Sequence, residues 1–389
     1  MEIEKILRRG FVDVISRENL KKKLRGKKKL RVKFGIDPTG AELHLGHAVP
    51  LKKLQQLQNL GHKIILLFGG FTATIGDPTG KNSARPPLTA DEVEKNSEKY
   101  LEMAGKILDI SKCEIRNNRD WLEKMDLKKF IKMAAQFSAS KIFERDMFKE
   151  RLKKGKSVEL HELLYPILVA FDSVELRADV EIGGTDQLFN LLCGRPMQKF
   201  FGQPQQEILT VPILEGLDGT QKMSKSLKNY ISLADPPDEI FGKIMSLPDK
   251  NMEKYFEIFT EIDEKIFKNE IKKNPRDAKI LLGKKIVDFL HDEKSGEIAA
   301  ENFRKKFAEK KIPENLPEFF CAEKIGILDL ISKIAKFAPS NSAAKKLVEQ
   351  RAVAFSGEKI FDPKKILEIA GGEILQVGRK KFAKILRKK

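Results

Sequence analysis

The feature that most constrains the fold is a strand, a helix and a second strand near the N-terminus. Residues 30–37, LRVKFGID, form a short apolar run with β-branched residues, which is typical of a buried strand. Residues 63–71, KIILLFGGF, form another. Between them, apolar residues recur at roughly helical spacing: Leu45, Val49, Leu54, Leu57 and Leu60. This order predicts a βαβ unit in a Rossmann-like, doubly wound parallel sheet that binds nucleotide at its carboxyl edge.

The rest of the chain divides by composition. Helix formers dominate residues 122–164, which predicts a helical insertion in an α/β domain over residues 1–226. Further strands are expected in ADVEIGG and ILTVPIL, within residues 178–214. Helical, charged sequence then predicts an α-helical domain over residues 227–309. Two prolines mark a linker over residues 310–324, before a small last domain over residues 325–389.

The charge is strongly positive and unevenly distributed. The formal net charge is +18, and residues 325–389 hold 15 Lys and Arg against 6 Asp and Glu, a net charge of +9. An excess of this size favours a polyanion as partner, and we expect the last domain to bind RNA.

The cysteines and the apolar runs bear on where the protein acts. The three cysteines, Cys113, Cys193 and Cys321, form no CxxC pair, so we expect neither a disulfide framework nor a zinc site. The N-terminus lacks the apolar core of a signal peptide, and no run approaches the length of a membrane span. We therefore expect a soluble cytoplasmic protein with no membrane contact and no bound metal.

Three short motifs are candidates for a nucleotide site. HLGH, residues 44–47, stands where the first strand passes into its helix; backbone N–H groups there favour anions, and Gly46 lets a flat base approach. GDPTG, residues 76–80, closes the second strand and opens toward the same crevice. KMSKS, residues 222–226, sets two lysines three residues apart. By itself that lysine pair is equally explained by a solvated loop.

Taken together, HLGH and KMSKS resemble the two signatures of the class I aminoacyl-tRNA synthetases. Within that class, the chain is most similar to the bacterial-type tyrosyl-tRNA synthetases. The similarity runs over essentially the whole chain and includes FGIDPTGAELHLGH, ATIGDPTGK, YPILVAFD and GGTDQLFN. Near the end, SNSAAKKLVEQRAVAFSGEKI and VGRKKF resemble a small RNA-binding domain shared with a ribosomal small-subunit protein.

The resemblance implies that tyrosine attacks ATP, with Mg²⁺, to give tyrosyl-adenylate, and that the tyrosyl group then passes to tRNA(Tyr). No organic cofactor is implied. The catalytic residues by motif position are Thr39, His44, His47, Lys222 and Lys225. The two lysines would stabilise the leaving pyrophosphate. The further ATP-binding residues are Asp37, Gly46, Gly184, Asp186 and Ser226, with Asp186 on the ribose.

The same resemblance implies a tyrosine pocket. Asp77, Tyr165 and Gln187 match positions that hold the substrate ammonium group, and Asp172 matches the acceptor of the phenol O–H. The sequence departs from the family at two places: Val169 stands where a Gln is usual, and Lys33 stands where many members have a Tyr that shares recognition of the phenol. A buried hydrogen-bond acceptor discriminates against phenylalanine, because phenylalanine has no hydroxyl group and leaves the acceptor without a partner. This enzyme family is the standard example of that effect.

The resemblance further implies a homodimer built around the helical insertion and anticodon contact by residues 227–309. The predicted RNA-binding residues of the last domain are Lys345, Lys346, Arg351, Arg379, Lys380 and Lys381. Two alternatives remain at this point. One is a tryptophanyl-tRNA synthetase, in which the same aspartate would accept an indole N–H. The other is a non-catalytic RNA-binding protein, since the C-terminal fold also occurs in ribosomal and RNA-modifying proteins.

Overall fold

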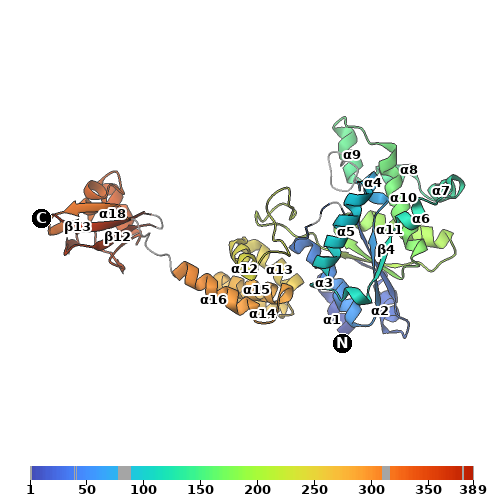
Figure 1. Ribbon diagram of the computed structural model, residues 1–389, viewed down its shortest axis with the longest axis horizontal. Helices are drawn as coiled ribbons and strands as arrows, with labels where there is room; N and C mark the ends of the chain where they lie inside the picture. The colour runs from blue at the N-terminus through green and yellow to red at the C-terminus, as the bar shows by residue number, and fades with distance from the viewer. Residues whose placement is uncertain are drawn as a thin grey trace. The chain divides into compact units, whose positions relative to one another are not determined.

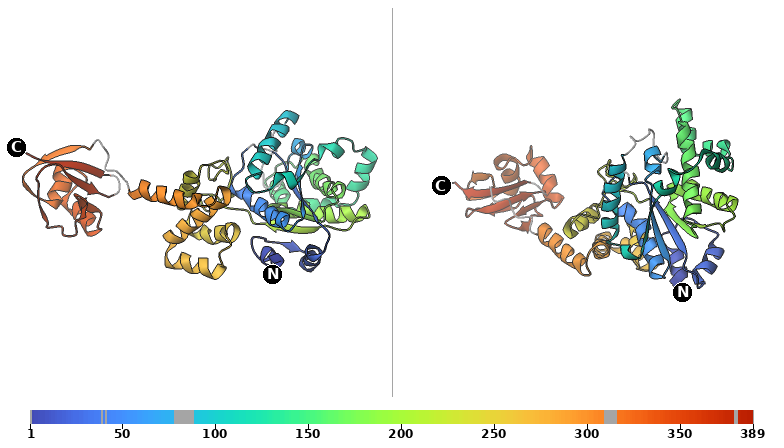
Figure 2. Two further views of the ribbon diagram at one scale, coloured as in Figure 1. Left: turned by 60° about the horizontal axis from the view of Figure 1, so that its bottom comes forward. Right: turned by 45° about the vertical axis from the view of Figure 1, so that its right-hand side comes forward.

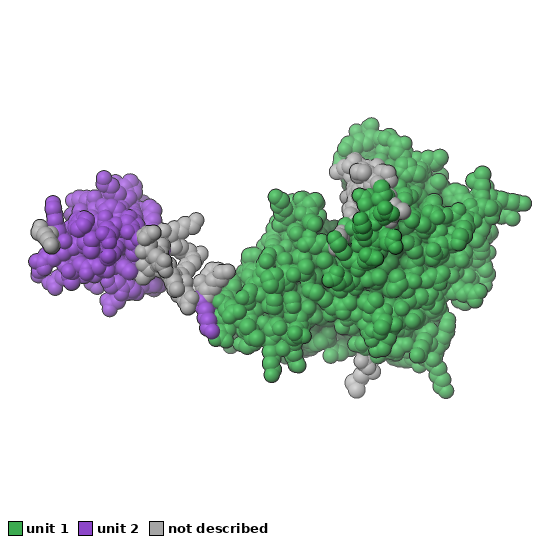
Figure 3. Space-filling model, in the orientation of Figure 1, with its two compact units in different colours: residues 1–303 green, residues 304–389 purple. Residues whose placement is uncertain are grey.

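The computed structural model describes residues 2–38, 40, 42–77, 89–308, 316–378 and 381–388. These residues form two compact units, 1–303 and 304–389, which Figure 3 colours separately. Each unit is described by itself. Within the described ranges, none of the helices has the length and apolar character needed to span a bilayer.

The first unit is built on a six-stranded sheet with the order β1-β6-β5-β2-β3-β4. The bounds of its strands are β1 Val14–Ile15, β2 Arg31–Ile36, β3 Lys63–Phe68, β4 Glu114–Asn117, β5 Val180–Gly184 and β6 Glu207–Val211. Strands β2 to β6 pair in parallel, and β1 pairs antiparallel with β6 at the edge. The predicted Rossmann-like α/β class is confirmed, with one short antiparallel strand added.

Helices lie on both faces of this sheet (Figures 1 and 2). The side chains of β3 explain why. Ile64, Leu66 and Phe68 join the core formed with helices α3 (Leu45–Asn59) and α5 (Ala90–Ala104). Ile65 and Leu67 instead pack on Leu176, at the end of helix α10 (Leu160–Glu175). Successive residues of a strand point to opposite faces, so a strand that is apolar at every position must be covered twice.

The connecting segments are helical. Their bounds are α1 Glu2–Arg8, α2 Arg17–Arg25, α3 Leu45–Asn59, α4 Thr72–Ile75, α5 Ala90–Ala104, α6 Arg119–Leu122, α7 Leu127–Ala134, α8 Ala139–Phe143, α9 Asp146–Lys153, α10 Leu160–Glu175 and α11 Leu188–Phe200. Helices α7 to α9 occupy most of the predicted insertion. Its last residues belong to α10, the helix that leads back to the sheet at β5.

Five helices follow the sheet: α12 Pro237–Ser246, α13 Met252–Phe259, α14 Glu264–Lys273, α15 Pro275–Leu290 and α16 Ser295–Ala308. The division between the two units, at residues 303 and 304, falls within α16. The buried side chains of these helices belong to the same hydrophobic core as those of α3 and β2. The predicted domain boundary at residues 226 and 227 therefore lies inside one compact unit. The division of this part of the chain into a catalytic domain, residues 1–226, and an anticodon-binding domain, residues 227–309, remains a prediction.

The second unit contains a five-stranded sheet with the order β10-β9-β12-β13-β7 and a two-stranded sheet of β11 and β8. The bounds are β7 Glu318–Cys321, β8 Lys324–Gly326, α17 Ile327–Asp329, a π-helical turn Leu330–Ile334, α18 Asn341–Glu349, β9 Val353–Phe355, β10 Glu358–Lys359, β11 Ile366–Glu368, β12 Glu373–Val377 and β13 Lys381–Arg387. The predicted small α+β unit is present.

The predicted linker over residues 310–324 is wrong at its end. Strand β7 lies inside it and pairs in parallel with β13. Pro317, which suggested a linker, stands directly before β7, and its carbonyl accepts a hydrogen bond from the N–H of Lys384 at 3.0 Å. A proline before the first residue of a strand leaves the ladder intact, so it is a poor linker signal here.

Candidate active site

A cavity of about 330 Å³ lies at the carboxyl ends of β2 and β5. Its lining brings together residues from motifs that lie far apart in the sequence. Of the predicted site residues, nine line it: Lys33, Asp37, His47, Asp77, Tyr165, Asp172, Asp186, Gln187 and Lys222. A topological switch point of an open α/β sheet is where such a cavity is expected, because the strands on either side of β2 lead their helices to opposite faces.

The two histidines of HLGH pack against each other at the start of α3. Their ring centroids are 3.9 Å apart, and the backbone N–H of His44 donates to Nδ1 of His47 at 3.2 Å. The pKa of His44 is lowered to about 3, mainly by burial and also by His47 and the Lys222 ammonium, and the pKa of His47 is lowered to about 4, mainly by burial and also by Lys222. Both rings are therefore neutral at physiological pH, and His47 holds its proton on Nε2.

Gly46 lets these rings pack closely at the helix start. A Cβ at this position would lie 3.0 Å from two atoms of the His44 ring. The chain after KMSKS returns beside the same segment, since the N–H of Leu45 donates to the carbonyl of Ile231 and that of Leu233 to the carbonyl of Leu43. Backbone hydrogen bonds thus join the HLGH segment to the segment that follows KMSKS.

The KMSKS segment is held by a turn of its own. The Asp218 carboxylate accepts hydrogen bonds from the backbone N–H groups of Thr220 and Gln221. The Asn229 side chain donates to the Asp218 carboxylate and accepts from the backbone N–H of Ser224. The Met223 side chain is buried in the core, which anchors the middle of the motif.

The charged residues of the motif reach across to the nucleotide side. Lys222 Nζ lies 2.8 Å from Asp186, and Lys225 Nζ lies 2.7 Å from Glu42, a residue four positions before Gly46. Ser226 Oγ lies 2.8 Å from Ser224 Oγ. More than half of the surface of each lysine side chain is exposed to solvent. Because these ion pairs are exposed, we expect that phosphate oxygens can replace the carboxylates that now hold the two lysines.

Hydrogen bonds between side chains order the middle of the cavity. Asp37 accepts from Thr72 Oγ1 at 2.9 Å and from the Tyr165 hydroxyl at 2.8 Å. Burial, together with the charges of Asp37 and Asp77, raises the pKa of Tyr165 far above its usual value, so Tyr165 stays a hydroxyl donor. Gln187 donates to Asp77 at 2.7 Å. Of the residues expected around the substrate ammonium, Gln187 is therefore bonded to Asp77, and Tyr165 is held by Asp37 on the lining of the same cavity.

Asp172 lies at the deep end of the cavity and is almost wholly buried. It accepts from the indole N–H of Trp121 at 2.9 Å and from the Asn118 amide at 3.2 Å. Burial raises the pKa of Asp172 to about 7, against the opposing effects of Lys33 and of these two donors. The carboxyl group that is expected to accept the phenol is thus poised to titrate near neutral pH.

Lys33 lines the cavity, but its ammonium group points to protein acceptors. Nζ lies 2.8 Å from Glu181 and 3.1 Å from the carbonyl of Val169. Val169 therefore holds Lys33 through its backbone carbonyl, and it also lines the cavity. Thr39 lies outside the described residues. Gly184 lies beside Asp186, where a Cβ would meet the carboxylate at 2.5 Å.

The predicted RNA-binding residues of the second unit are exposed wherever they are described. Lys345 and Lys346 lie on α18, Arg351 follows it with its guanidinium over the Phe361 ring, and Lys381 begins β13. Arg379 and Lys380 lie outside the described residues.

Sequence reasoning missed the partners that hold the predicted residues: Glu42, Thr72, Asn118, Trp121, Glu181 and Asn190. Most of these partner residues lie outside the sequence motifs from which the site was predicted. Trp121, the only tryptophan of the chain, was the one available signal.

Comparison with known proteins decides the family. The family model described as "tRNA synthetases class I (W and Y)" matches residues 25–308. The Tyrosine--tRNA ligase of Thermotoga maritima is 46% identical over 387 residues, which cover 98% of this chain and 96% of that protein. The one from Francisella tularensis is 46% identical and covers 100% and 99%. The chain belongs to the class I tyrosyl-tRNA synthetases.

Solved structures of tyrosyl-tRNA synthetases share the fold. The mitochondrial enzyme of Aspergillus nidulans, truncated at its C-terminus, gives a TM-score of 0.63 at 21% identity and covers 79% of this chain and 94% of that one. The Archaeoglobus fulgidus enzyme, solved with L-tyrosine, gives 0.61 at 24% and covers 77% and 98%.

The relatives also separate the alternatives. The family model includes both W and Y enzymes, but the full-length relatives are tyrosine ligases, so the tryptophanyl assignment is not supported. Because the chain belongs to the tyrosyl-tRNA synthetases, the alternative of a non-catalytic RNA-binding protein is not supported either.

Proposed function

We propose that this tyrosine–tRNA ligase forms tyrosyl-adenylate in the cavity at the carboxyl ends of β2 and β5. The observation that supports this best is the convergence of His47, Asp172, Asp186 and Lys222 on one cavity. The tyrosine carboxylate forms a bond to the α-phosphorus of ATP, while the bond to the bridging oxygen breaks and pyrophosphate leaves with the electron pair. The substrate is its own nucleophile, so the protein supplies position and charge.

The cavity residues divide this work. Asp172 accepts the phenol O–H, and Asp77, Tyr165 and Gln187 surround the ammonium group. Asp186 binds the ribose once Lys222 leaves it for phosphate. The neutral His47 offers Nε2–H, and Lys222 and Lys225 stabilise charge on the pyrophosphate as it leaves. Thr39, His44, Gly46 and Ser226 complete the phosphate side by motif position.

The residues on the phosphate side fit an anion. Lys222 and Lys225 repel a cation, so we place Mg²⁺ on the ATP phosphates and assign the protein no resident metal. Among the described residues there is no group of three or more His, Cys, Asp and Glu suited to a metal ion. Mg²⁺ would neutralise phosphate charge when it is bound with ATP.

The second step passes the tyrosyl group to tRNA. A hydroxyl of the terminal ribose attacks the acyl carbon, and AMP leaves with the electron pair of the broken bond. We assign the exposed cations Lys345, Lys346, Arg351 and Lys381 to tRNA backbone contacts, because phosphate contact supplies most of the affinity in such complexes. We assign the anticodon contact to helices α12 to α16, and the cytoplasm as the place of action.

The homodimer is proposed at the helical insertion. Leu127 and Ile131 lie one turn apart on α7 with 74% and 58% of their surface exposed. Two large apolar side chains on one helix face are typical of an interface. In sedimentation experiments, changing both to Lys is expected to give monomers, while Ile266→Lys, an exposed apolar residue on α14, is expected to leave the dimer intact.

Amino-acid-dependent exchange of pyrophosphate into ATP tests the proposal, with all twenty amino acids and no tRNA. Exchange is expected with tyrosine alone. Asp172→Asn is expected to lower kcat/KM for tyrosine by about 10- to 100-fold, the effect of losing a hydrogen bond to a charged acceptor. Asp120→Asn, at an exposed position on α6, is the matched control. Exchange driven by tryptophan would refute the assignment.

A further inference from the structure

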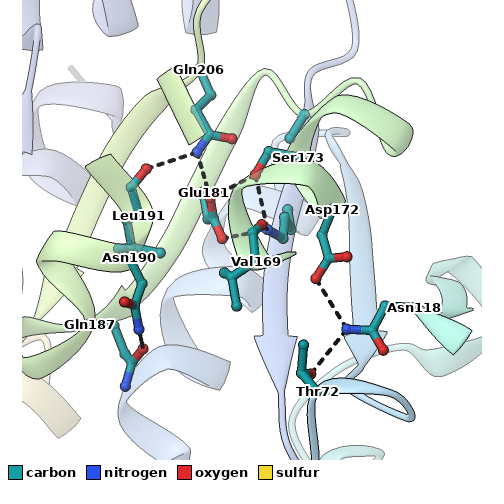
Figure 4. A network of polar contacts seen from close by, with 12 residues as sticks. Thr72, Asn118, Val169, Asp172, Ser173, Glu181, Gln187, Asn190, Leu191 and Gln206 are labelled. Atoms are coloured by element: carbon teal, nitrogen blue, oxygen red, sulfur yellow. Dashed lines mark hydrogen bonds and ion pairs between the residues drawn. The ribbon is translucent and has the colours of Figure 1, made fainter. Parts of the chain in front are cut away.

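A buried ion pair of Lys33 and Glu181 lies on the lining of the cavity, and Figure 4 labels Glu181 with its neighbours Ser173 and Gln206. Lys33, on β2, is 0% exposed, and its Nζ contacts Glu181 Oε1 at 2.8 Å, Ser173 Oγ at 2.9 Å and the Val169 carbonyl at 3.1 Å. Glu181, on β5, also accepts from Ser173 Oγ and from the Gln206 amide. All three ammonium protons have acceptors, which is the condition for retaining such a charge inside a protein.

The contacts of Lys33 bracket the residue that recognises the substrate. Val169 and Ser173 are four positions apart on α10, and Asp172 lies on the turn between them. Lys33 therefore attaches this particular turn to β2 and β5. From the other side, Trp121 and Asn118 hold the two carboxylate oxygens. The position of Asp172 is thus set by groups on three separate parts of the fold.

The pair also sets the local charge. Burial is the main cause of the raised pKa of Asp172, Lys33 opposes it, and Glu181 adds to it. The other ionisable groups lining the same cavity are Asp37, Asp77, Tyr165, Asp186, His47 and Lys222. On the α7 side, Lys129 pairs with Glu175, one turn beyond Asp172. Lys33 is therefore the cation with the largest effect on the Asp172 carboxyl group.

We propose that Lys33 is a positioning and specificity-determining residue for tyrosine, whose buried charge, set against Glu181, tunes the Asp172 carboxylate as the phenol acceptor. The proposal rests on the proposed function. An ionised carboxylate accepts the phenol O–H more strongly than a carboxylic acid does. Phenylalanine has no O–H and leaves an ionised Asp172 unpaired, so ionisation of Asp172 is not expected to improve its binding.

The charge arrangement fixes a direction for the pH dependence. Asp172 gains its charge as pH rises through about 7, so kcat/KM for tyrosine relative to phenylalanine is expected to rise over the same interval. Lys33→Gln removes the opposing cation, so the midpoint is expected to move to higher pH. Glu181→Gln removes the neighbouring anion, so the midpoint is expected to move to lower pH.

The experiment measures pyrophosphate exchange with tyrosine and with phenylalanine from pH 5.5 to 8.5 in the full-length chain. A midpoint shift of about one pH unit changes the protonation ratio of Asp172 about tenfold at a given pH. KM for tyrosine is expected to carry most of the change, and kcat little. The double variant Lys33→Gln with Glu181→Gln is expected to return toward the wild-type midpoint.

The double variant also guards against loss of folding. Lys33→Gln leaves Glu181 buried without its cation, which is strongly destabilising, whereas the double variant contains no unpaired buried charge. Midpoints that move in the same direction in both single variants, or that stay at the wild-type value in folded protein, would overturn the proposal. A wild-type chain without tyrosine-dependent exchange would instead overturn the proposed function, so the two failures are distinct.

Discussion

At the scale of single residues, the site depends on groups held in unusual ionisation states. His47 is buried with a lowered pKa of about 4, whereas its unfolded value is near 6.5. Between these values the unfolded chain takes up a proton that the folded chain does not. The free energy of unfolding is therefore highest above pH 6.5 and falls as pH drops toward 4.

Replacing that ring should remove part of the pH dependence. His47→Asn keeps an acceptor near the His44 N–H but has no titrating group. Its loss of stability between pH 7 and pH 4.5 is expected to be smaller than in the wild type by about 2 kcal/mol, measured from urea unfolding at both pH values. His161→Asn, at an exposed position, is the control. An equal loss in wild type and His47→Asn would show that the pKa of His47 is not lowered in the folded state.

The lysines of KMSKS act at a different stage. Lys225 pairs with Glu42, and we expect it to exchange that carboxylate for phosphate. Lys225→Ala is expected to slow adenylate formation about 100- to 1000-fold, as measured by rapid quench, with little change in tyrosine affinity. Lys228→Ala, on the same loop, is expected to react at nearly the wild-type rate. Weaker tyrosine binding at an unchanged rate would contradict a role in the transition state.

The residues identified from sequence are those whose identity lies in a motif. His47, Lys222 and Asp172 were predicted from their positions in the motifs HLGH, KMSKS and YPILVAFD. Their partners do not: Glu42 was an unremarkable turn residue, and Glu181 belongs to a strand whose buried character argues against a charge. A buried carboxylate becomes predictable only once Lys33 is known to face it, and that depends on the register of β2 with β5.

At the scale of elements, close packing of α12 against α15 depends on one glycine. A Cβ at Gly283 in α15 would lie 2.9 Å from the Phe241 ring of α12. Gly283→Ala is expected to lower the free energy of unfolding by about 1–3 kcal/mol through overpacking. Gly242 in α12 has no atom within 4 Å of an added Cβ, so Gly242→Ala is expected to raise it by up to about 1 kcal/mol. Thermal unfolding of both variants would compare them; equal changes would contradict the packing argument.

Elements were predictable where apolar residues were continuous or regularly spaced. Strands β2, β3, β5 and β6 and helix α3 lie close to their expected positions. Strand β4, EIRN, was missed because an edge strand with alternating polar residues gives no apolar run. Strand β7 was missed because its signal was masked by prolines. In both cases the strand forms by pairing with a distant partner, β3 or β13, rather than by local preference.

At the scale of the whole molecule, the proposed site of adenylate formation lies in one compact unit and the predicted RNA-binding cations lie in the other. The cavity and its lining lie entirely within the first, and the cluster Lys345, Lys346, Arg351 and Lys381 lies within the second. Because β7 pairs with β13, a cut that separates them must precede residue 318. A fragment of residues 1–308 retains all helices of the first unit.

This fragment is expected to keep tyrosine-dependent pyrophosphate exchange and to bind tRNA with a weaker dependence on salt. If four cations each contact a phosphate, the slope of log K against log salt becomes less steep by about three. Changing the four to Ala in the full-length chain should reproduce that slope. Changing Lys359, Lys364 and Lys365 instead, also exposed in the second unit, tests net charge alone and is expected to alter it less. Equal slopes in fragment and full-length protein would mean that the second unit binds something other than this tRNA, because counterions released by phosphate contacts must appear in the salt dependence.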